Sequence, residues 1–152
     1  MTPNQHFVAI FSTSIFTFLL GLFVYFKGRT KRVNQIFTLY SFSIATWSLG
    51  QALHSIASDL EVCLFWARLS HIGVVFIPTL FVHFVFEFLG IVKEKKRILI
   101  LAYACSIFFT YFNLFTKLYI PTAVPKFSIR FYIEPGILYL PSVIFFIFFI
   151  II

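Results

Sequence analysis

The stretch "FWARLSHIGVVFIPTLFVHF", Phe65–Phe84, decides the fold. It is long and apolar enough to cross a bilayer, which takes roughly 20 such residues in a helix. It nevertheless contains Arg68, His71, His83 and Pro78. Ionisable side chains in a membrane helix face protein or a water-filled cavity rather than lipid, since burial in hydrocarbon is costly. The stretch therefore predicts a membrane helix with one polar face.

The composition of the whole chain agrees with a membrane protein. Hydrophobic residues make up 61% and charged residues 11% of the 152 positions, against about 25% charged in soluble domains. A water-soluble chain of this length could not hide 24 phenylalanines in one core. The net charge of +7 is concentrated in short loops, so we attribute it to membrane topology and expect no nucleic-acid partner.

Five apolar segments divide the chain, and each should be a helix because a lone strand cannot satisfy its backbone in lipid. We therefore predict an all-α, polytopic transmembrane helix bundle with five spans. Their approximate bounds are 7–26, 36–57, 62–89, 98–116 and 137–152. The fifth has 16 residues and ends at Ile152 without a charge or an interfacial aromatic anchor. We expect it to be truncated, so that the sequence is a fragment without an output module.

The loops predict the orientation. Eight of the twelve Lys and Arg residues lie in two short loops, 27–32 and 93–97, which should be cytoplasmic by the positive-inside rule. The loop at 58–61 carries Asp59 and Glu61 and should be outside. The N-terminus is then outside, and so is the connection 117–136.

That outer connection has two open interpretations. Its apolar residues alternate at Phe127, Ile129 and Phe131 among several prolines, which fits a short strand or one arm of a hairpin. A segment lying on the bilayer surface fits the same pattern.

The predicted second span has a polar stripe at helical spacing. It consists of Tyr40, Ser43, Trp47, Gly50, Gln51, His54 and Ser58. Because the second and third spans run in opposite directions, Gln51 and His54 should lie at about the depth of Arg68 and His71. This stripe should face protein or a cavity.

Two interpretations of Arg68 follow. In the first, Arg68 ties the second and third helices together through Gln51 and the outer acids. In the second, it lines a pocket open to the outside, whose ligand carries an acidic or carbonyl group, and Pro78 lets the third helix bend when the pocket is filled. The residues of that candidate pocket are Trp47, Gln51, His54, Arg68 and His71.

No pattern in the chain predicts catalysis, a cofactor or a metal. The four histidines are followed by Phe, Ser, Ile and Phe, which is not the context of a phosphoacceptor histidine, and there is no glycine-rich nucleotide loop. His54, Asp59, Glu61 and Cys63 match no standard metal-ligand spacing. Cys63 and Cys105 should lie at different depths, too far apart for a disulfide.

Several short pieces, in this order, resemble the N-terminal seven-helix membrane region of bacterial sensor histidine kinases and related receptors. The resemblance covers essentially the whole chain, although no single piece is a catalytic signature. The pieces are Asn34 with Phe37 and Leu39; Trp47–Gly50; Phe65–Leu69; Gly73, Pro78 and His83–Phe84; and "YIEPGILY", Tyr132–Tyr139, as the start of the fifth helix.

The resemblance implies seven spans, an outside N-terminus and a cytoplasmic output module. The region would sense a small ligand or a membrane stimulus. It implies location in the bacterial inner (plasma) membrane, contact with the bilayer and a homodimer formed by the parent receptor. A small transporter or channel subunit is the alternative, although only Pro78 breaks a helix and no internal repeat is visible. An intramembrane enzyme would need a partner for Glu87, the only acid in or near a span.

Overall fold

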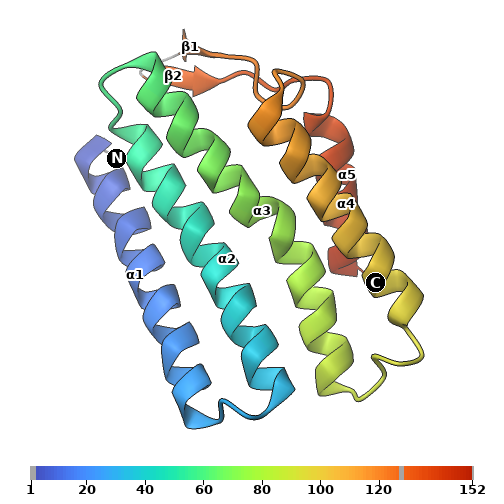
Figure 1. Ribbon diagram of the computed structural model, residues 1–152. Coiled ribbons are helices and arrows are strands. Elements are labelled where there is room, and N and C mark those ends of the chain that lie inside the picture. Colours follow the sequence, from blue (N-terminus) through green and yellow to red (C-terminus); the bar gives the residue numbers. More distant parts are fainter. Residues whose placement is uncertain (1–2, 127–128, 152) are drawn as a thin grey trace.

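The computed structural model describes residues 3–126 and 129–151, and within them the chain forms five helices and one hairpin (Figure 1). The helices lie roughly along one direction, which confirms the predicted all-α bundle. In chain order the elements are α1 (Pro3–Lys27), α2 (Arg32–Ser55), α3 (Leu60–Phe88), α4 (Lys96–Phe115), β1 (Ala123–Lys126), β2 (Ile129–Ile133) and α5 (Tyr139–Ile151).

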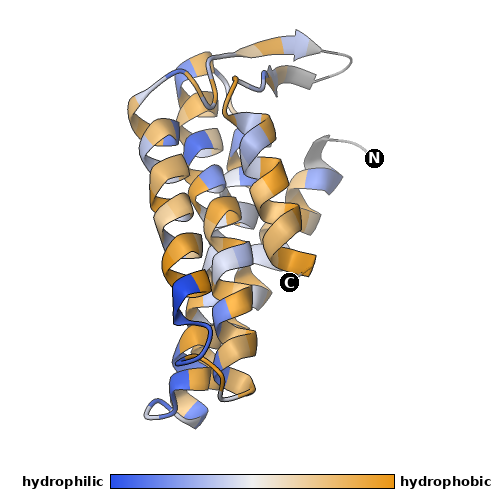
Figure 2. Cartoon of the chain, turned by 90° about the vertical axis from the view of Figure 1, so that its right-hand side faces the viewer, coloured by the Kyte–Doolittle hydropathy of each residue, from blue (hydrophilic) through white to orange (hydrophobic). Residues whose placement is uncertain are grey.

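Every predicted span corresponds to a helix, with bounds that differ by a few residues. Within the described residues, α1 from Gln5, α3 and α4 are long and apolar enough to cross a membrane, and α5 is a shorter apolar helix. The helix α2 is long but less apolar, because its polar stripe lowers its hydropathy. Figure 2 shows the apolar residues along the helices and hydrophilic residues gathered at the end that holds the two basic loops.

The bundle has two distinct ends. The α1–α2 and α3–α4 loops lie at one, which we call the basic end, and the α2–α3 loop and the hairpin lie at the other, which we call the hairpin end (Figure 1). At the hairpin end Asp59 caps α3 by accepting a hydrogen bond from the Val62 backbone N–H at 2.9 Å. At the basic end Gly90 has a φ of 72°, and the Ile91 N–H bonds the Phe86 carbonyl at 3.0 Å. This left-handed glycine cap stops α3 and turns the chain toward α4.

Small residues bring α1, α2 and α3 close together. A Cβ atom on Gly73 would lie 2.5 Å from the Ser43 carbonyl oxygen, and one on Gly50 would lie 2.6 Å from the Ser70 Cβ. Ser70 Oγ uses this proximity to donate to the Trp47 carbonyl at 3.0 Å. Without a hydrophobic driving force between helices in lipid, such close backbone packing and interhelical hydrogen bonds hold a bundle together.

Asn34, one of the residues that carried the family resemblance, fixes the first turn of the bundle. Its side-chain amide donates to the Gly28 carbonyl at 3.2 Å and to the Val24 carbonyl at 3.4 Å. Val24 lies in the last turn of α1, where carbonyls lack a helical partner, and Gly28 follows the helix directly. Asn34 therefore couples the end of α1 to the start of α2.

Hydroxyl groups link α3 to α4 beside Pro78. Ser106 Oγ from α4 donates to the Val75 carbonyl at 3.2 Å and lies 2.8 Å from Thr79 Oγ1. Pro78 has no N–H, so one helical hydrogen bond is missing there, and the α3 ribbon bends near its middle (Figure 1). The hydroxyl pair supplies polar partners to this weakened part of the helix.

The connection between α4 and α5 forms an antiparallel hairpin, so the strand interpretation holds for its described part. Ala123 pairs with Ile133 and Val124 with Tyr132, with an irregularity before Lys126. Phe127, on which the predicted alternation began, lies outside the described residues. The hairpin packs at one end of α3, and its return leads directly into α5.

Candidate functional site

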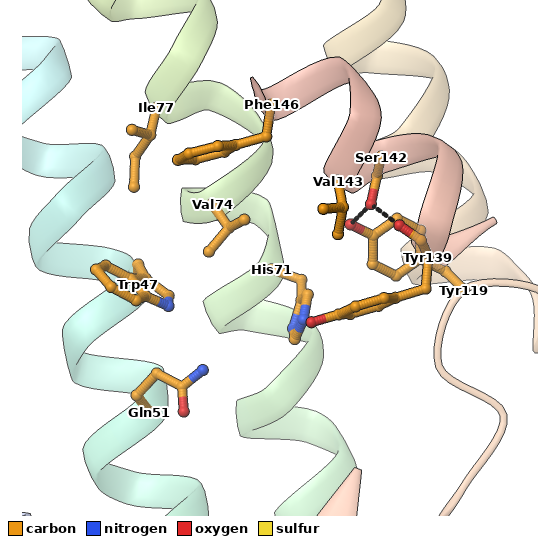
Figure 3. A pocket seen from close by; sticks show the side chains of 10 residues that line it. All are labelled: Trp47, Gln51, His71, Val74, Ile77, Tyr119, Tyr139, Ser142, Val143 and Phe146. Carbon is orange, nitrogen blue, oxygen red and sulfur yellow. Dashed lines mark hydrogen bonds between the residues drawn. The ribbon is translucent and has the colours of Figure 1, made fainter. Parts of the chain in front are cut away.

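A pocket of about 310 Å³ opens between α2, α3 and α5 toward the hairpin end (Figure 3). Its volume lies at the lower end of the range for small-molecule sites, roughly 300 Å³ and upward. The lining side chains come from all three helices and from the segment after α4. They are Trp47, Gln51, His71, Val74, Ile77, Tyr119, Tyr139, Ser142, Val143 and Phe146.

Three rings form one wall of this pocket. The centroids of His71 and Tyr119 are 5.6 Å apart, those of His71 and Tyr139 are 5.8 Å apart, and those of the two tyrosines are 5.9 Å apart. These spacings are typical of edge-to-face aromatic contacts. Through these contacts α3, α5 and the segment that follows α4 form one continuous surface.

Ser142 fixes the hydroxyl of Tyr119. Its Oγ donates to the Tyr139 carbonyl at 2.6 Å and lies 2.7 Å from the Tyr119 hydroxyl. The serine has one proton, so the Tyr119 hydroxyl must be the donor in the second bond. Burial raises the pKa of Tyr119 to about 12, which keeps this hydroxyl protonated and able to donate.

The hydrogen bonds of the pocket set the roles of its polar atoms. His71 Nδ1 lies 2.8 Å from the Ala67 carbonyl, which can only accept, so Nδ1 carries the proton and Nε2 of the neutral ring is an acceptor. His54 Nε2 lies 2.7 Å from Gln51 Oε1, so the Gln51 amide group keeps its N–H donors for the pocket. Figure 3 shows the Gln51 amide nitrogen and the Trp47 indole nitrogen turned toward this space.

A second hollow of about 310 Å³ continues the first toward the hairpin. The two share Gln51, His71 and Tyr139. The second adds His6 from α1, His54 from α2, and residues of β2 and the turn that follows it. His54 Nδ1 is buried and has no hydrogen-bond partner, so this imidazole also offers an acceptor.

The histidines are the titratable groups with the lowest ordinary pKa among the described residues that line the combined site. Among the side chains that the structure describes, no Lys, Arg, Asp or Glu lines either hollow. Among the residues that the structure describes, no group of three or more His, Cys, Asp or Glu side chains is placed to hold a metal ion. The arrangement suits binding through aromatic contact and neutral hydrogen bonds.

The structure brings four of the five predicted site residues together and separates the fifth. Trp47, Gln51, His54 and His71 line the two connected hollows, whereas Arg68 lines a different groove between α3 and α4. Neither predicted link from Arg68, to Gln51 or to the outer acids, is present among the described residues. Arg68 and His71 are three positions apart on α3, so their side chains point about 60° apart around the helix axis. Because α3 is packed on both sides, this angle is enough to place them on different faces.

Sequence reasoning missed the contribution of the later part of the chain. Tyr119, Tyr139, Ser142 and Phe146 complete the pocket, and His6 reaches it from α1. The segment "YIEPGILY", Tyr132–Tyr139, predicts the start of the fifth helix and by itself indicates no pocket. The available signal was the pair of tyrosines Tyr119 and Tyr139 beside the fifth span, because a buried tyrosine hydroxyl usually has a polar partner.

Fold and site together define a multi-pass helical membrane protein with a ligand-sized pocket toward the hairpin end of the bundle. The family model for the N-terminal 7TM region of histidine kinase matches residues 9–152. The chain belongs to this family and is a membrane sensor region. Comparison with curated proteins and with solved structures gave no match.

Proposed function

We propose that this chain is the signal-input region of a bacterial sensor histidine kinase, and that a small ligand reaches the α2–α3–α5 pocket from outside the cell. The observation that carries the proposal is the pocket around His71, which joins three helices and the hairpin. Family membership supports the receptor role. The kinase that receives the signal would lie in the cytoplasm.

The ligand class follows from the lining. Trp47, Tyr139 and Phe146 suit a flat or branched apolar body. Gln51 and Trp47 offer N–H donors to a carbonyl oxygen, and the acceptor nitrogen of His71 suits a hydroxyl or amide N–H. Arg68 is not in the pocket and cannot pair with an acidic group of the ligand there. We therefore propose a neutral, carbonyl-containing molecule.

The helix α3 offers a route from the pocket to the basic end. His71, Val74 and Ile77 line the pocket, and Pro78 follows directly. A ligand that favours one bend of α3 over another would shift the population of the two shapes. The Ser106–Thr79 contact on α4 would hold the bend in one of them.

We further propose the membrane arrangement. All five helices cross the bacterial inner (plasma) membrane, with the N-terminus and the hairpin outside and the basic loops in the cytoplasm. The concentration of Lys and Arg in the two basic loops supports this orientation. The parent receptor works as a homodimer, a proposal that rests on the family alone.

The access route can be tested with single cysteines. In a background with Cys63 and Cys105 replaced by Ala, we expect Gln51→Cys in whole cells to react with a membrane-impermeant thiol reagent added outside. A matched Tyr103→Cys, on α4 and outside both hollows, should remain unlabelled. Labelling of Tyr103→Cys but not of Gln51→Cys would contradict the proposed access.

The signalling role can be tested in the full receptor. His71→Phe keeps an aromatic ring and removes the acceptor nitrogen and the bond to the Ala67 carbonyl, so the protein should accumulate and lose its response to stimulus. Phe108→Leu, on an exposed position of α4, is the control and should respond normally. An unchanged response of His71→Phe at normal abundance would refute the role of this pocket in sensing.

A further inference from the structure

A separate groove of about 340 Å³ lies between α3 and α4, on a face that does not include the pocket residues. Its walls are apolar and come from Leu64, Leu69 and Ile72 of α3 and Leu114 of α4. Phe65, at its edge, is 61% exposed. In a membrane protein an open apolar groove of this kind faces acyl chains.

Two charged residues lie along this groove, and neither has a partner among the side chains that the structure describes. Arg68 Nε is buried without a hydrogen-bond partner, and no carboxylate of the described chain lies within ion-pair distance of it. Glu61 lines the same groove seven residues earlier, at its mouth. Arginine keeps its charge in proteins, so a guanidinium left unpaired at this depth is costly.

Asn113 fixes the groove at the depth of Arg68. Its side-chain amide donates to the Arg68 backbone carbonyl at 2.8 Å, and Asn113 is fully buried. This bond uses the backbone of Arg68 and leaves the guanidinium free. The two helices are thereby tied together at the depth of the groove.

The order of groups along α3 matches the order of groups in a phospholipid. Glu61 lies at the membrane surface, Arg68 lies about 10 Å deeper at 1.5 Å per residue, and Ile72 lies a further turn inward. A headgroup ammonium, its phosphate and an acyl chain follow one another in this direction in either leaflet. Charge-assisted hydrogen bonds from Arg to phosphate and from ammonium to carboxylate are among the strongest available.

We propose that this groove binds one phospholipid with a primary ammonium headgroup, of the phosphatidylethanolamine type. Its phosphate accepts hydrogen bonds from Arg68, its ammonium donates to Glu61, and one acyl chain covers Leu69, Ile72 and Leu114. The carboxylate distinguishes this lipid from phosphatidylglycerol, which has no cation, and from phosphatidylcholine, whose quaternary ammonium has no N–H donor. The inference is independent of the ligand pocket.

The test is native mass spectrometry of the delipidated chain in detergent, titrated with the three lipids carrying identical acyl chains. We expect phosphatidylethanolamine to bind about tenfold more tightly than the other two. Arg68→Gln should reduce binding of all three lipids, and Arg68→Lys should restore part of it. Glu61→Gln should remove the preference for phosphatidylethanolamine while leaving phosphatidylcholine binding unchanged.

Lys96→Gln, an exposed basic position at the start of α4 outside the groove, is the matched control and should bind lipid like the parent chain. Equal binding of the three lipids by the parent chain, or unchanged binding by Arg68→Gln, would overturn the proposal. So would displacement of the lipid by soluble glycerophosphoethanolamine, which has no acyl chain. If Arg68→Gln does not fold, judged by circular dichroism, Glu61→Gln and Leu69→Trp, which fills the groove, decide the question.

Discussion

Replacing Gly73 by alanine tests the contact that places α2 against α3. The new Cβ would lie 2.5 Å from the Ser43 carbonyl oxygen and 2.6 Å from the Trp47 backbone nitrogen. Ordinary van der Waals contact begins near 3.4 Å, so the two backbones must separate by about 0.9 Å. Both neighbours are backbone atoms, which cannot rotate away as a side chain can.

The free-energy cost follows from three contributions. Overpacking of a tight contact costs about 3 kcal/mol at the upper end of its range. The bond from Ser70 Oγ to the Trp47 carbonyl, now 3.0 Å, would be lost, at about 0.6 kcal/mol in a membrane. The higher helix propensity of alanine returns about 1 kcal/mol. We therefore expect Gly73→Ala to lower the free energy of unfolding by about 2 to 3 kcal/mol.

The assay is reversible unfolding of the purified chain in mixed micelles of a mild detergent and sodium dodecyl sulfate, followed by circular dichroism. The matched control is Gly21→Ala on α1, whose Cβ would lie 2.9 Å from the Ser41 Cβ and 3.2 Å from the Phe42 ring, so that α1 and α2 must separate by about 0.5 Å. We expect a smaller loss there than at Gly73, because the required separation is about half as large and no backbone atom is among the three nearest contacts. Equal stability of Gly73→Ala and Gly21→Ala would refute the argument that a backbone contact sets the α2–α3 distance.

Three further predictions rest on other contacts. Ser106→Ala removes the hydroxyl that bonds the Val75 carbonyl at 3.2 Å and should cost about 1 kcal/mol of unfolding free energy, whereas an unchanged value would show that the bend of α3 needs no support from α4. Burial raises the pKa of Tyr119 to about 12 in the folded protein, against about 10 in the unfolded chain. The stabilisation by its neutral hydroxyl should therefore be complete below about pH 10 and be lost as the pH rises through about 12. Tyr119→Phe should abolish this loss, measured as the pH dependence of the free energy of unfolding. Reporter fusions at Arg29 should be active in the cytoplasm and fusions at Asp59 outside, and a cytoplasmic signal at Asp59 would reverse the proposed topology.

The sequence by itself determined the membrane class, the helices and their approximate ends. These are local properties: a run of apolar residues has a length, and a loop rich in Lys and Arg has a charge. The polar stripe through Trp47, Gln51 and His54 also indicated which side of α2 faces protein. Each of these features can be recognised without knowing which helices are neighbours.

Only the tertiary structure decided the membership of the site. Arg68 and His71 are close in sequence, yet α3 is packed on both sides, so a rotation of about 60° sends them to different neighbours. Tyr119 and Tyr139 reach His71 from segments about 50 and 70 residues away, because the hairpin returns α5 against α3. Helical periodicity gives the faces of a helix, whereas the partner of each face depends on how the other helices pack around it.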